Sequence, residues 1–253
     1  MNMRPNRVKQ KLASGETAYL VSGLEGPDEI DLFGPVGFDG AWLEAEHGSV
    51  DFGDIPDLTR ACDLWGMTSV LRVNSNQQSL VYRSLDRGAQ GIVVPHVNTR
   101  EEAENVVEGG KFAPLGRRGL FTSRQGIGVT DYMSVANDHT LLIVLIEDIV
   151  AVENLDQILE VDHIDVFFVA PSDLAATMGL IGQLDHSQVQ TTIDETLARI
   201  QKRGRVAGTL ANNENVGRYS AAGVRCFLTN TAPWLAAGAR GFLDRSEAAR
   251  GGE

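Results

Sequence analysis

Eight short apolar segments, separated by amphipathic stretches, are the feature of this sequence that most constrains its fold. The stretches between them read as helices that end in glycine, for example PDLTRACDLWG and NQQSLVYRSLDRG. Strands that alternate with helices run parallel and connect through right-handed crossovers. Eight such units are the number that closes a parallel sheet into a barrel. The apolar segments are residues 16–22, 40–46, 68–73, 91–97, 141–148, 166–170, 205–211 and 225–230.

The pattern therefore predicts an α/β protein with a (β/α)8 TIM barrel. A length of 253 residues is typical of one such barrel, although two ordinary domains would also fit it. An open doubly wound sheet is the alternative architecture. We expect one domain that covers residues 1–253.

The charge of the chain limits its partners. A formal net charge of -12 repels phosphate, which argues against nucleic acid and against an anionic membrane as the main partner. No stretch reaches the roughly 20 apolar residues of a membrane span, and the first residues lack the apolar part of a signal peptide. Cys62 and Cys226 form no CxxC pair and are expected to be core residues in a reducing compartment. We expect a soluble, cytoplasmic protein.

Two acidic residues follow buried strands at equivalent places. Glu147 comes directly after the apolar run 141–146, and Asp173 comes shortly after the run 166–170. The carboxyl ends of parallel strands form the edge of the sheet where chemistry is done. Carboxylates without nearby cysteine or histidine ligands suit a hard cation such as Mg2+ or Mn2+. The structural alternatives are a first-turn carboxylate for Glu147 and an N-cap for Asp173, helped by Ser172.

Further polar residues fall at the same predicted rim. His47 follows the second strand and precedes a glycine, which gives it the access that proton transfer needs, although a lone histidine is more often structural. Arg72 ends the third strand, where it could bind a substrate carboxylate or form an ion pair with a rim acid such as Glu46. Asp86 could orient His47 or be an ordinary acid at a helix end. His96 lies near the same rim.

A long connection between the fourth and fifth strands contains KFAPLGRRGLFTSRQGIG. Its arginines, Arg117, Arg118 and Arg124, are unusual in an acidic protein and could hold an anion or a neighbouring subunit. A solvated surface loop is the alternative.

These motifs together resemble the HpcH/HpaI aldolases, which are metal-dependent pyruvate aldolases on a (β/α)8 barrel. The likeness covers nearly the whole chain, and the order and spacing of the motifs are specific only in combination. The matching stretches are FDGAWLEAEHGSVDF, VLRVN, LDRGAQGIVVPHVNTREEAE, APLGRRG, IVLIED, VFFVAPSDLAATMG and AAGVRCFLTNTAPWL.

The resemblance implies a role for each matched position. Glu147 and Asp173 match the metal ligands, and Arg72 matches the arginine that binds the 2-oxo acid. His47 matches the general acid/base, and Asp86 matches the acid that pairs with that histidine. The backbone around Ser172 matches the segment that lies against the substrate carboxylate.

The resemblance also implies cofactor, substrates and assembly. The cofactor would be a divalent cation, Mg2+ or Mn2+, with Co2+ or a similar ion as a further option. The substrates would be a 2-oxo acid and an aldehyde. In this family the C-terminal helix commonly packs on a neighbour, so a homo-oligomer, a trimer or hexamer, is expected.

The sequence departs from the commonest family pattern at several positions, which concern the acceptor pocket more than the metal pair. The departures are Glu44, Leu145, His96, Ala170 and the stretch LFTSRQGIG.

Other reactions that use the same chemistry stay open, namely oxaloacetate decarboxylation and cleavage of citramalyl-type acyl-CoA. A non-catalytic 2-oxo acid sensor is also open. No lysine lies among the predicted rim residues, which argues against a Schiff-base aldolase.

Overall fold

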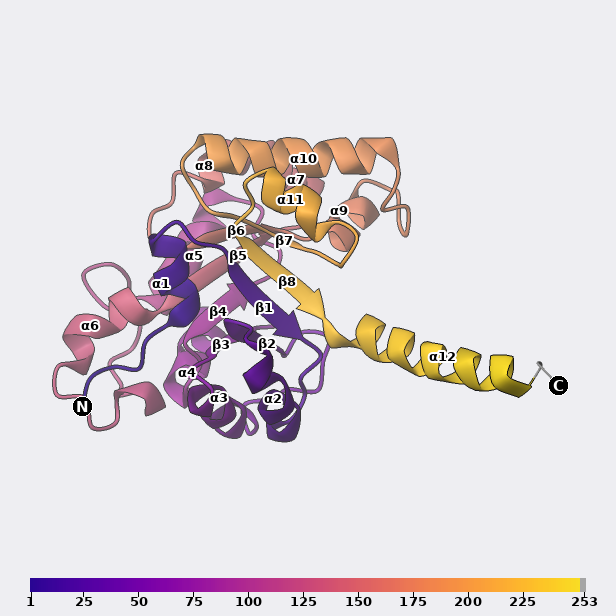
Figure 1. Cartoon of the computed structure of the whole chain (residues 1–253). Coiled ribbons are helices and arrows are strands. Elements are labelled where there is room, and N and C mark those ends of the chain that lie inside the picture. Colours follow the sequence, from indigo (N-terminus) through magenta and orange to yellow (C-terminus); the bar gives the residue numbers. More distant parts are fainter. Residues whose placement is uncertain (251–253) are drawn as a thin grey trace.

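Eight parallel strands form a closed barrel, with each strand paired to the next and β8 paired to β1 (Figure 1). This computed structural model describes residues 1–250, so the end of the predicted domain, residues 251–253, lies outside the described residues. The predicted (β/α)8 barrel is confirmed, and the open doubly wound sheet is wrong. The strands are β1 (Ala18–Ser22), β2 (Gly40–Glu44), β3 (Thr68–Arg72), β4 (Gly91–Val94), β5 (Leu141–Ile146), β6 (Val166–Val169), β7 (Ala207–Leu210) and β8 (Cys226–Asn230).

Side chains alternate between two apolar cores along each strand. Leu145 and Phe168 belong to the cluster inside the barrel, whereas their neighbours Ile146 and Val169 belong to the cluster under the helices. Both faces of the strands are therefore buried, which explains why the sequence shows continuous apolar runs instead of apolar–polar alternation. All six residues of β5 are buried.

Helices cover the outside of the barrel. A capping box starts α5: the Thr99 side chain accepts from the Glu102 backbone, and the Glu102 side chain accepts from the Thr99 backbone. The two helices predicted from PDLTRACDLWG and NQQSLVYRSLDRG are α3 and α4. The helices of the outer layer and its connections are α2 (Pro27–Phe33), α3 (Ile55–Leu64), α4 (Gln78–Arg87), α5 (Arg100–Gly110), α6 (Tyr132–His139), α7 (Ile149–Glu153), α8 (Leu155–Ile158), α9 (Pro171–Thr177), α10 (Ser187–Lys202) and α11 (Val216–Ala221), with short 3-10 turns η1 (Gly34–Val36) and η2 (Arg124–Gly126).

Helix α1 (Arg7–Ala13) closes the amino-terminal end of the barrel. Its buried side chains, Val8 and Leu12, join the cluster inside the barrel. The Val8 backbone N–H also donates to Thr68 Oγ1 at 3.1 Å, which ties the helix to the start of β3. The carboxyl ends of the strands are therefore the end left for a binding site.

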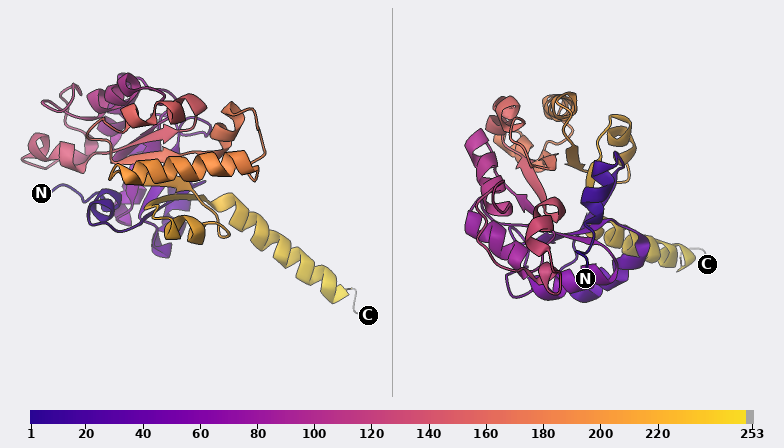
Figure 2. Two further views of the ribbon diagram at one scale, coloured as in Figure 1. Left: turned by 90° about the horizontal axis from the view of Figure 1, so that it is seen from above. Right: turned by 90° about the vertical axis from the view of Figure 1, so that its left-hand side faces the viewer.

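The last helix, α12 (Thr231–Arg250), extends away from the barrel (Figures 1 and 2). Its first turn is anchored by Trp234, whose ring lies 6.5 Å from Phe33 and 6.0 Å from Phe38 between centroids. Beyond that turn, large apolar side chains are exposed: Leu235, Phe242 and Leu243 have exposed fractions of 67%, 72% and 58%.

The basic connection between β4 and β5 is held by ion pairs within the chain. It leads into the amino-terminal end of β5, so it lies at the end of the barrel opposite the predicted rim. Arg118 is almost fully buried and also lies over the Phe112 ring, 4.4 Å from its centroid. Each of these arginines therefore already has an acidic partner within the chain. The Arg118 and Arg124 side chains are largely buried, whereas the Arg117 side chain is 81% exposed. The pairs are Arg117 with Glu108 at 2.7 Å, Arg118 with Asp86 at 2.8 Å and Arg124 with Asp63 at 2.7 Å.

The two cysteines are buried and free, as the sequence predicts. Burial raises the pKa of each thiol to about 12, and the negative charge of Asp63 adds to the shift of Cys62. Both residues are thus unreactive core side chains. No helix among residues 1–250 is long and apolar enough to cross a membrane.

Candidate active site

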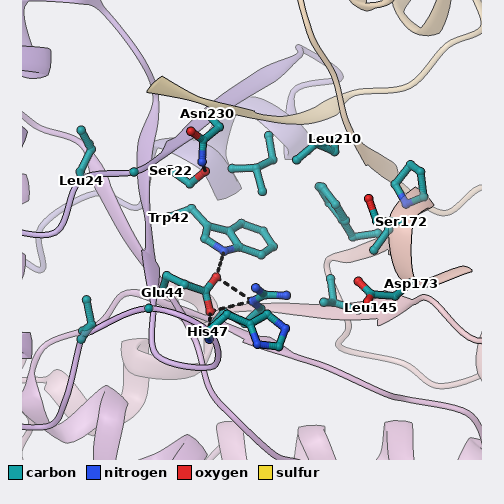
Figure 3. A pocket seen from close by; sticks show the side chains of 18 of the residues that line it. Ser22, Leu24, Trp42, Glu44, His47, Leu145, Ser172, Asp173, Leu210 and Asn230 are labelled. Carbon is teal, nitrogen blue, oxygen red and sulfur yellow. Dashed lines mark hydrogen bonds and ion pairs between the residues drawn. The ribbon is translucent and has the colours of Figure 1, made fainter. Parts of the chain in front are cut away.

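A pocket of about 370 Å³ opens at the carboxyl ends of the strands (Figure 3). Its floor is apolar and comes from the cluster inside the barrel, with Trp42, Leu145, Phe168 and Leu228 among the lining side chains. Polar groups stand around that floor, and Figure 3 shows them converging from several strand ends. An apolar pocket with a few convergent polar groups is the usual form of a small-molecule site. The polar lining includes Ser22, Glu44, His47, Arg72, Ser172, Asp173 and Asn230.

Arg72 is fixed by two carboxylates from the neighbouring strand. Its Nε donates to Glu44 Oε1 at 3.0 Å and to Oε2 at 2.8 Å, and its Nη1 lies 2.9 Å from Glu46 Oε2. Glu44 and Arg72 are paired residues in the register of β2 and β3, so the contact follows directly from strand pairing. The ion pair that the sequence left as an alternative is therefore present. Nη2 has no protein partner among residues 1–250, and the residue lines the pocket.

Glu44 also shapes the turn that carries His47. Glu44 Oε1 accepts from the backbone N–H of Glu46 at 2.9 Å and of His47 at 3.1 Å. The chain then folds back at Gly48, where an added Cβ would lie 2.6 Å from the Glu44 carbonyl oxygen. This tight turn leaves the His47 side chain 70% exposed at the pocket. The imidazole thus has access to a ligand, and its Nε2 lies 3.8 Å from Glu46 Oε2.

Glu147 is a buried carboxylate at the end of β5. Only 2% of its surface is exposed, and burial raises the pKa of its carboxyl group. The negative charges of Asp173 and Glu46 act in the same direction, against the hydrogen bond from the His96 backbone. The first-turn alternative is wrong for Glu147, because Asp148 is the N-cap of α7 and Glu147 precedes it.

Asp173 lies in the first turn of α9 and lines the pocket. The N-cap alternative is wrong, because Ala170 occupies the cap position and no side chain caps this helix. Ser172 precedes Asp173 in the same turn. The first backbone N–H groups of a helix have no partner within the helix, so this turn presents donors at the pocket.

The residues present fit a divalent cation. No arginine or lysine side chain pairs with Glu147 or Asp173 within residues 1–250. Burial, and then the negative charges of Asp173 and Glu46, raise the pKa of Glu147, so its buried charge lacks a compensating cation. A cation would supply that compensation through oxygen ligands. No group of three or more His, Cys, Asp or Glu side chains in the described part of the chain is arranged to hold a metal ion. A site of two carboxylates would leave positions free for substrate.

The structure does not bring Asp86 and His47 together within the described chain. Asp86 lies at the end of α4, which leads into the amino-terminal end of β4, and its Oδ1 accepts from Arg118 Nη2 at 2.8 Å. His47 follows β2 at the opposite end of the barrel. The orienting role of Asp86 stays a prediction.

Sequence reasoning gave two residues of the site too little weight. Glu44 appeared there only as a departure from a family pattern, yet it contacts both Arg72 and the His47 turn. Its place opposite Arg72 on the next strand could have been found by aligning the strand ends. Trp42 sits among the pocket side chains and its Nε1 donates to Glu44 Oε2 at 3.3 Å (Figure 3). Its place on an apolar strand does not distinguish it from an ordinary core side chain.

Comparisons with known proteins place this chain among a set of similar enzymes. The family described as HpcH/HpaI aldolase/citrate lyase matches residues 21–228. The chain is 33% identical to the hydroxypyruvate/pyruvate aldolase of Roseobacter denitrificans, over 83% of this chain and 84% of that protein. It is 35% identical to the 5-keto-4-deoxy-D-glucarate aldolase of Salmonella arizonae, over 82% of each.

A solved structure shows the same likeness in three dimensions. The HpcH/HpaI aldolase/citrate lyase family protein from Burkholderia cenocepacia superposes with a TM-score of 0.89 at 28% identity. The match covers 96% of this chain and 99% of that one.

Proposed function

This chain belongs to the HpcH/HpaI aldolase/citrate lyase family, and from that premise we propose a metal-dependent class II aldolase that cleaves, and reversibly forms, 4-hydroxy-2-oxo acids. The products of cleavage are pyruvate or a related 2-oxo acid and an aldehyde. The relatives named as aldolases make this chain a carbon–carbon lyase. The observation that carries the proposal is the gathering of Arg72, His47 and Asp173 around one pocket, beside buried Glu147.

Glu147 and Asp173 would hold the cation, Mg2+ or Mn2+ in the first instance. When bound, a divalent cation supplies a Lewis acid that stabilises negative charge developing on the keto oxygen of a 2-oxo acid. Leu145, which is apolar and 1% exposed, helps keep water away from this side of the pocket. Exclusion of water strengthens every electrostatic contact there.

Arg72 binds the carboxylate of the 2-oxo acid. Because Nε and Nη1 are already taken by Glu44 and Glu46, Nη2 is the donor left for substrate. The two glutamates fix the guanidinium plane before substrate arrives, so little side-chain freedom is lost on binding. The backbone N–H groups around Ser172 provide further donors from the first turn of α9.

His47 moves the proton. In the cleavage direction a base removes the proton from the C4 hydroxyl, the bond between C3 and C4 breaks, and the aldehyde leaves. The electron pair of that bond passes to C3 as the enolate of the 2-oxo acid, and the proton is then returned to C3. His47 is exposed at the pocket mouth and held by its backbone contact to Glu44, which suits a group that takes and returns a proton. No lysine lines the pocket in the described part of the chain, which agrees with a mechanism without a Schiff base.

The test is a screen with Mg2+ or Mn2+ present, in which pyruvate and hydroxypyruvate are offered with a panel of aldehydes. We expect aldol products that disappear when a chelator is added. Exchange of the pyruvate methyl protons with deuterated solvent should occur without any aldehyde. Binding of pyruvate without this exchange would indicate a sensor and refute the proposal.

The same assay separates the rival reactions. Oxaloacetate and citramalyl-type acyl-CoA are offered in parallel, and turnover of these without aldehyde-dependent turnover would contradict the aldolase proposal. The basic loop gives no support to a CoA site, since Arg117, Arg118 and Arg124 are paired within the chain.

We propose a homo-oligomer, a trimer or hexamer, in which α12 packs on a neighbouring copy. The exposed Leu235, Phe242 and Leu243 support this, because large apolar side chains on a helix that extends from the barrel gain most from being covered.

A further inference from the structure

His96 has an unusual backbone conformation at the carboxyl end of the barrel. It follows β4 and Pro95, and its φ is +53°. His163, at +66°, is the other residue besides glycine with a positive φ among residues 1–250. Such conformations are uncommon for side-chain-bearing residues and persist where surrounding contacts fix them.

This conformation places the backbone N–H and the imidazole of His96 against Glu147. The His96 backbone N–H donates to Glu147 Oε1 at 2.8 Å, and the imidazole Nδ1 lies 3.3 Å from the same oxygen. On its other side, the imidazole Nε2 lies 3.8 Å from Glu46 Oε1. The ring therefore stands between the carboxylate predicted to hold the cation and the carboxylate that fixes Arg72.

Core packing does not explain this placement. The His96 side chain is 63% exposed, so it fills no interior space. Glu147 needs such a partner, because it is buried near two other carboxylates, Asp173 and Glu46, which repel it. The His96 backbone N–H holds Glu147 Oε1, and the imidazole beside it restricts the rotamer of the carboxylate, which leaves the other oxygen for a ligand.

We propose that the His96 imidazole is a positioning residue for Glu147, which holds this carboxylate ready for the divalent cation and apart from the Glu46–Arg72 pair. The inference rests on the proposed function, because it takes Glu147 as a cation ligand. His96 is not among the residues that line the pocket, so we assign it to Glu147 and not to the cation or substrate. Loss of comparable partners of metal ligands lowers metal affinity about 10- to 100-fold.

The experiment titrates Mn2+ into the protein without substrate and follows free Mn2+ by electron paramagnetic resonance. His96→Gly is the main variant, because glycine accepts a positive φ and retains the backbone N–H, so only the imidazole is lost. His96→Leu is the second variant, with an apolar side chain of similar size. We expect the Kd for Mn2+ to rise about tenfold or more in both.

His163→Gly is the matched control. It makes the same substitution at the other left-handed histidine, which is exposed and leads into the amino-terminal end of β6. Its Mn2+ affinity should equal that of the wild type, while thermal melts compare the effect of both glycine variants on stability. Equal Mn2+ affinity of wild type, His96→Gly and His96→Leu would overturn the role of His96 and leave the aldolase proposal intact. A wild-type protein that binds no Mn2+ would overturn both.

Discussion

Arg72 and Glu44 face each other across β2 and β3, and Arg72 Nε donates to both carboxylate oxygens of Glu44. The pair holds the Arg72 guanidinium group at the pocket and fixes the orientation of its plane. It also links Arg72, the residue proposed to bind the 2-oxo acid, to the turn of His47, because Glu44 Oε1 also accepts from the His47 backbone.

Arg72→Lys should retain Mn2+ binding and weaken binding of pyruvate by about tenfold or more, because a charged hydrogen bond contributes about 1.5–3 kcal/mol. A lysine ammonium cannot reproduce the planar fork that contacts both glutamates. Isothermal titration with each ligand measures the two affinities. Arg60→Lys, on the exposed face of α3, is the control and should change neither. Normal pyruvate affinity in Arg72→Lys would show that the arginine has another role.

Asp173→Ala should abolish Mn2+ binding while the barrel stays folded, because Asp173 lines the pocket and caps no helix. The matched control is Asp57→Ala, which removes a first-turn aspartate from α3 that does not line the pocket. Metal titration and circular dichroism report the two properties separately. Retention of wild-type Mn2+ affinity in Asp173→Ala would exclude the residue as a ligand.

His47→Ala should lower the rate of aldol cleavage about 10²- to 10⁴-fold, which is the usual contribution of a general acid or base. The affinity for Mn2+ should stay near that of the wild type, because the imidazole contacts Glu46 only loosely and Glu147 not at all within residues 1–250. Steady-state kinetics and metal titration are compared on the same preparation. Equal losses in both would mean that His47 is structural.

Lys111 gives a prediction on stability and pH. Burial lowers the pKa of its ammonium group to about 7, with the nearby charge of Lys9 acting in the same direction. Between about pH 7 and the ordinary lysine pKa of about 10.4, the unfolded chain binds a proton that the folded chain lacks, so stability from this group rises with pH. Below about pH 7 the folded chain carries the buried ammonium charge, so the full loss of stability from this group applies.

Lys111→Met should remove the contribution of this group to the dependence of stability on pH. The substitution also removes hydrogen bonds to the carbonyls of Asn137 and Thr140. The difference in free energy of unfolding, wild type minus variant, should therefore increase from pH 7 to pH 10. Urea unfolding at several pH values measures it, with the exposed Lys202→Met as control. A difference that is constant with pH would contradict the lowered pKa.

Phe242→Asp should shift the protein toward smaller assemblies if α12 packs on a neighbouring copy. Phe242 is 72% exposed in the single chain, so the substitution should leave the barrel folded. Light scattering coupled to gel filtration gives the mass. Glu247→Lys changes charge on the same helix without removing an apolar group and should keep the wild-type mass. An unchanged mass in Phe242→Asp would count against this interface.

The barrel could be predicted from sequence because its signals are local and repeated. Each apolar run is long enough for a strand buried on both faces, and Gly66 and Gly88 mark the ends of α3 and α4 with positive φ. The strand ends then placed Glu147 and Arg72 at the same edge of the sheet. Alternation of apolar and amphipathic segments is enough for that result.

Contacts that depend on side-chain direction could not be predicted in the same way. The pairing of Arg118 with Asp86 joins a loop to a helix end, and no spacing in the sequence indicates it. The positive φ of His96 likewise depends on the contacts around β4 and β5. Such details arise from tertiary packing, where neighbours from distant segments decide which partner a polar group finds.

Helix α1 and the ion pairs of Arg118 and Arg124 stabilise the closed, amino-terminal end of the barrel. The residues that select substrates lie at the opposite, open end. Natural variation or protein engineering can therefore alter the aldehyde accepted at the open mouth with little loss of thermal tolerance. Conversely, substitutions that stabilise the closed end should raise the thermal stability of the enzyme and leave its substrate preference unchanged.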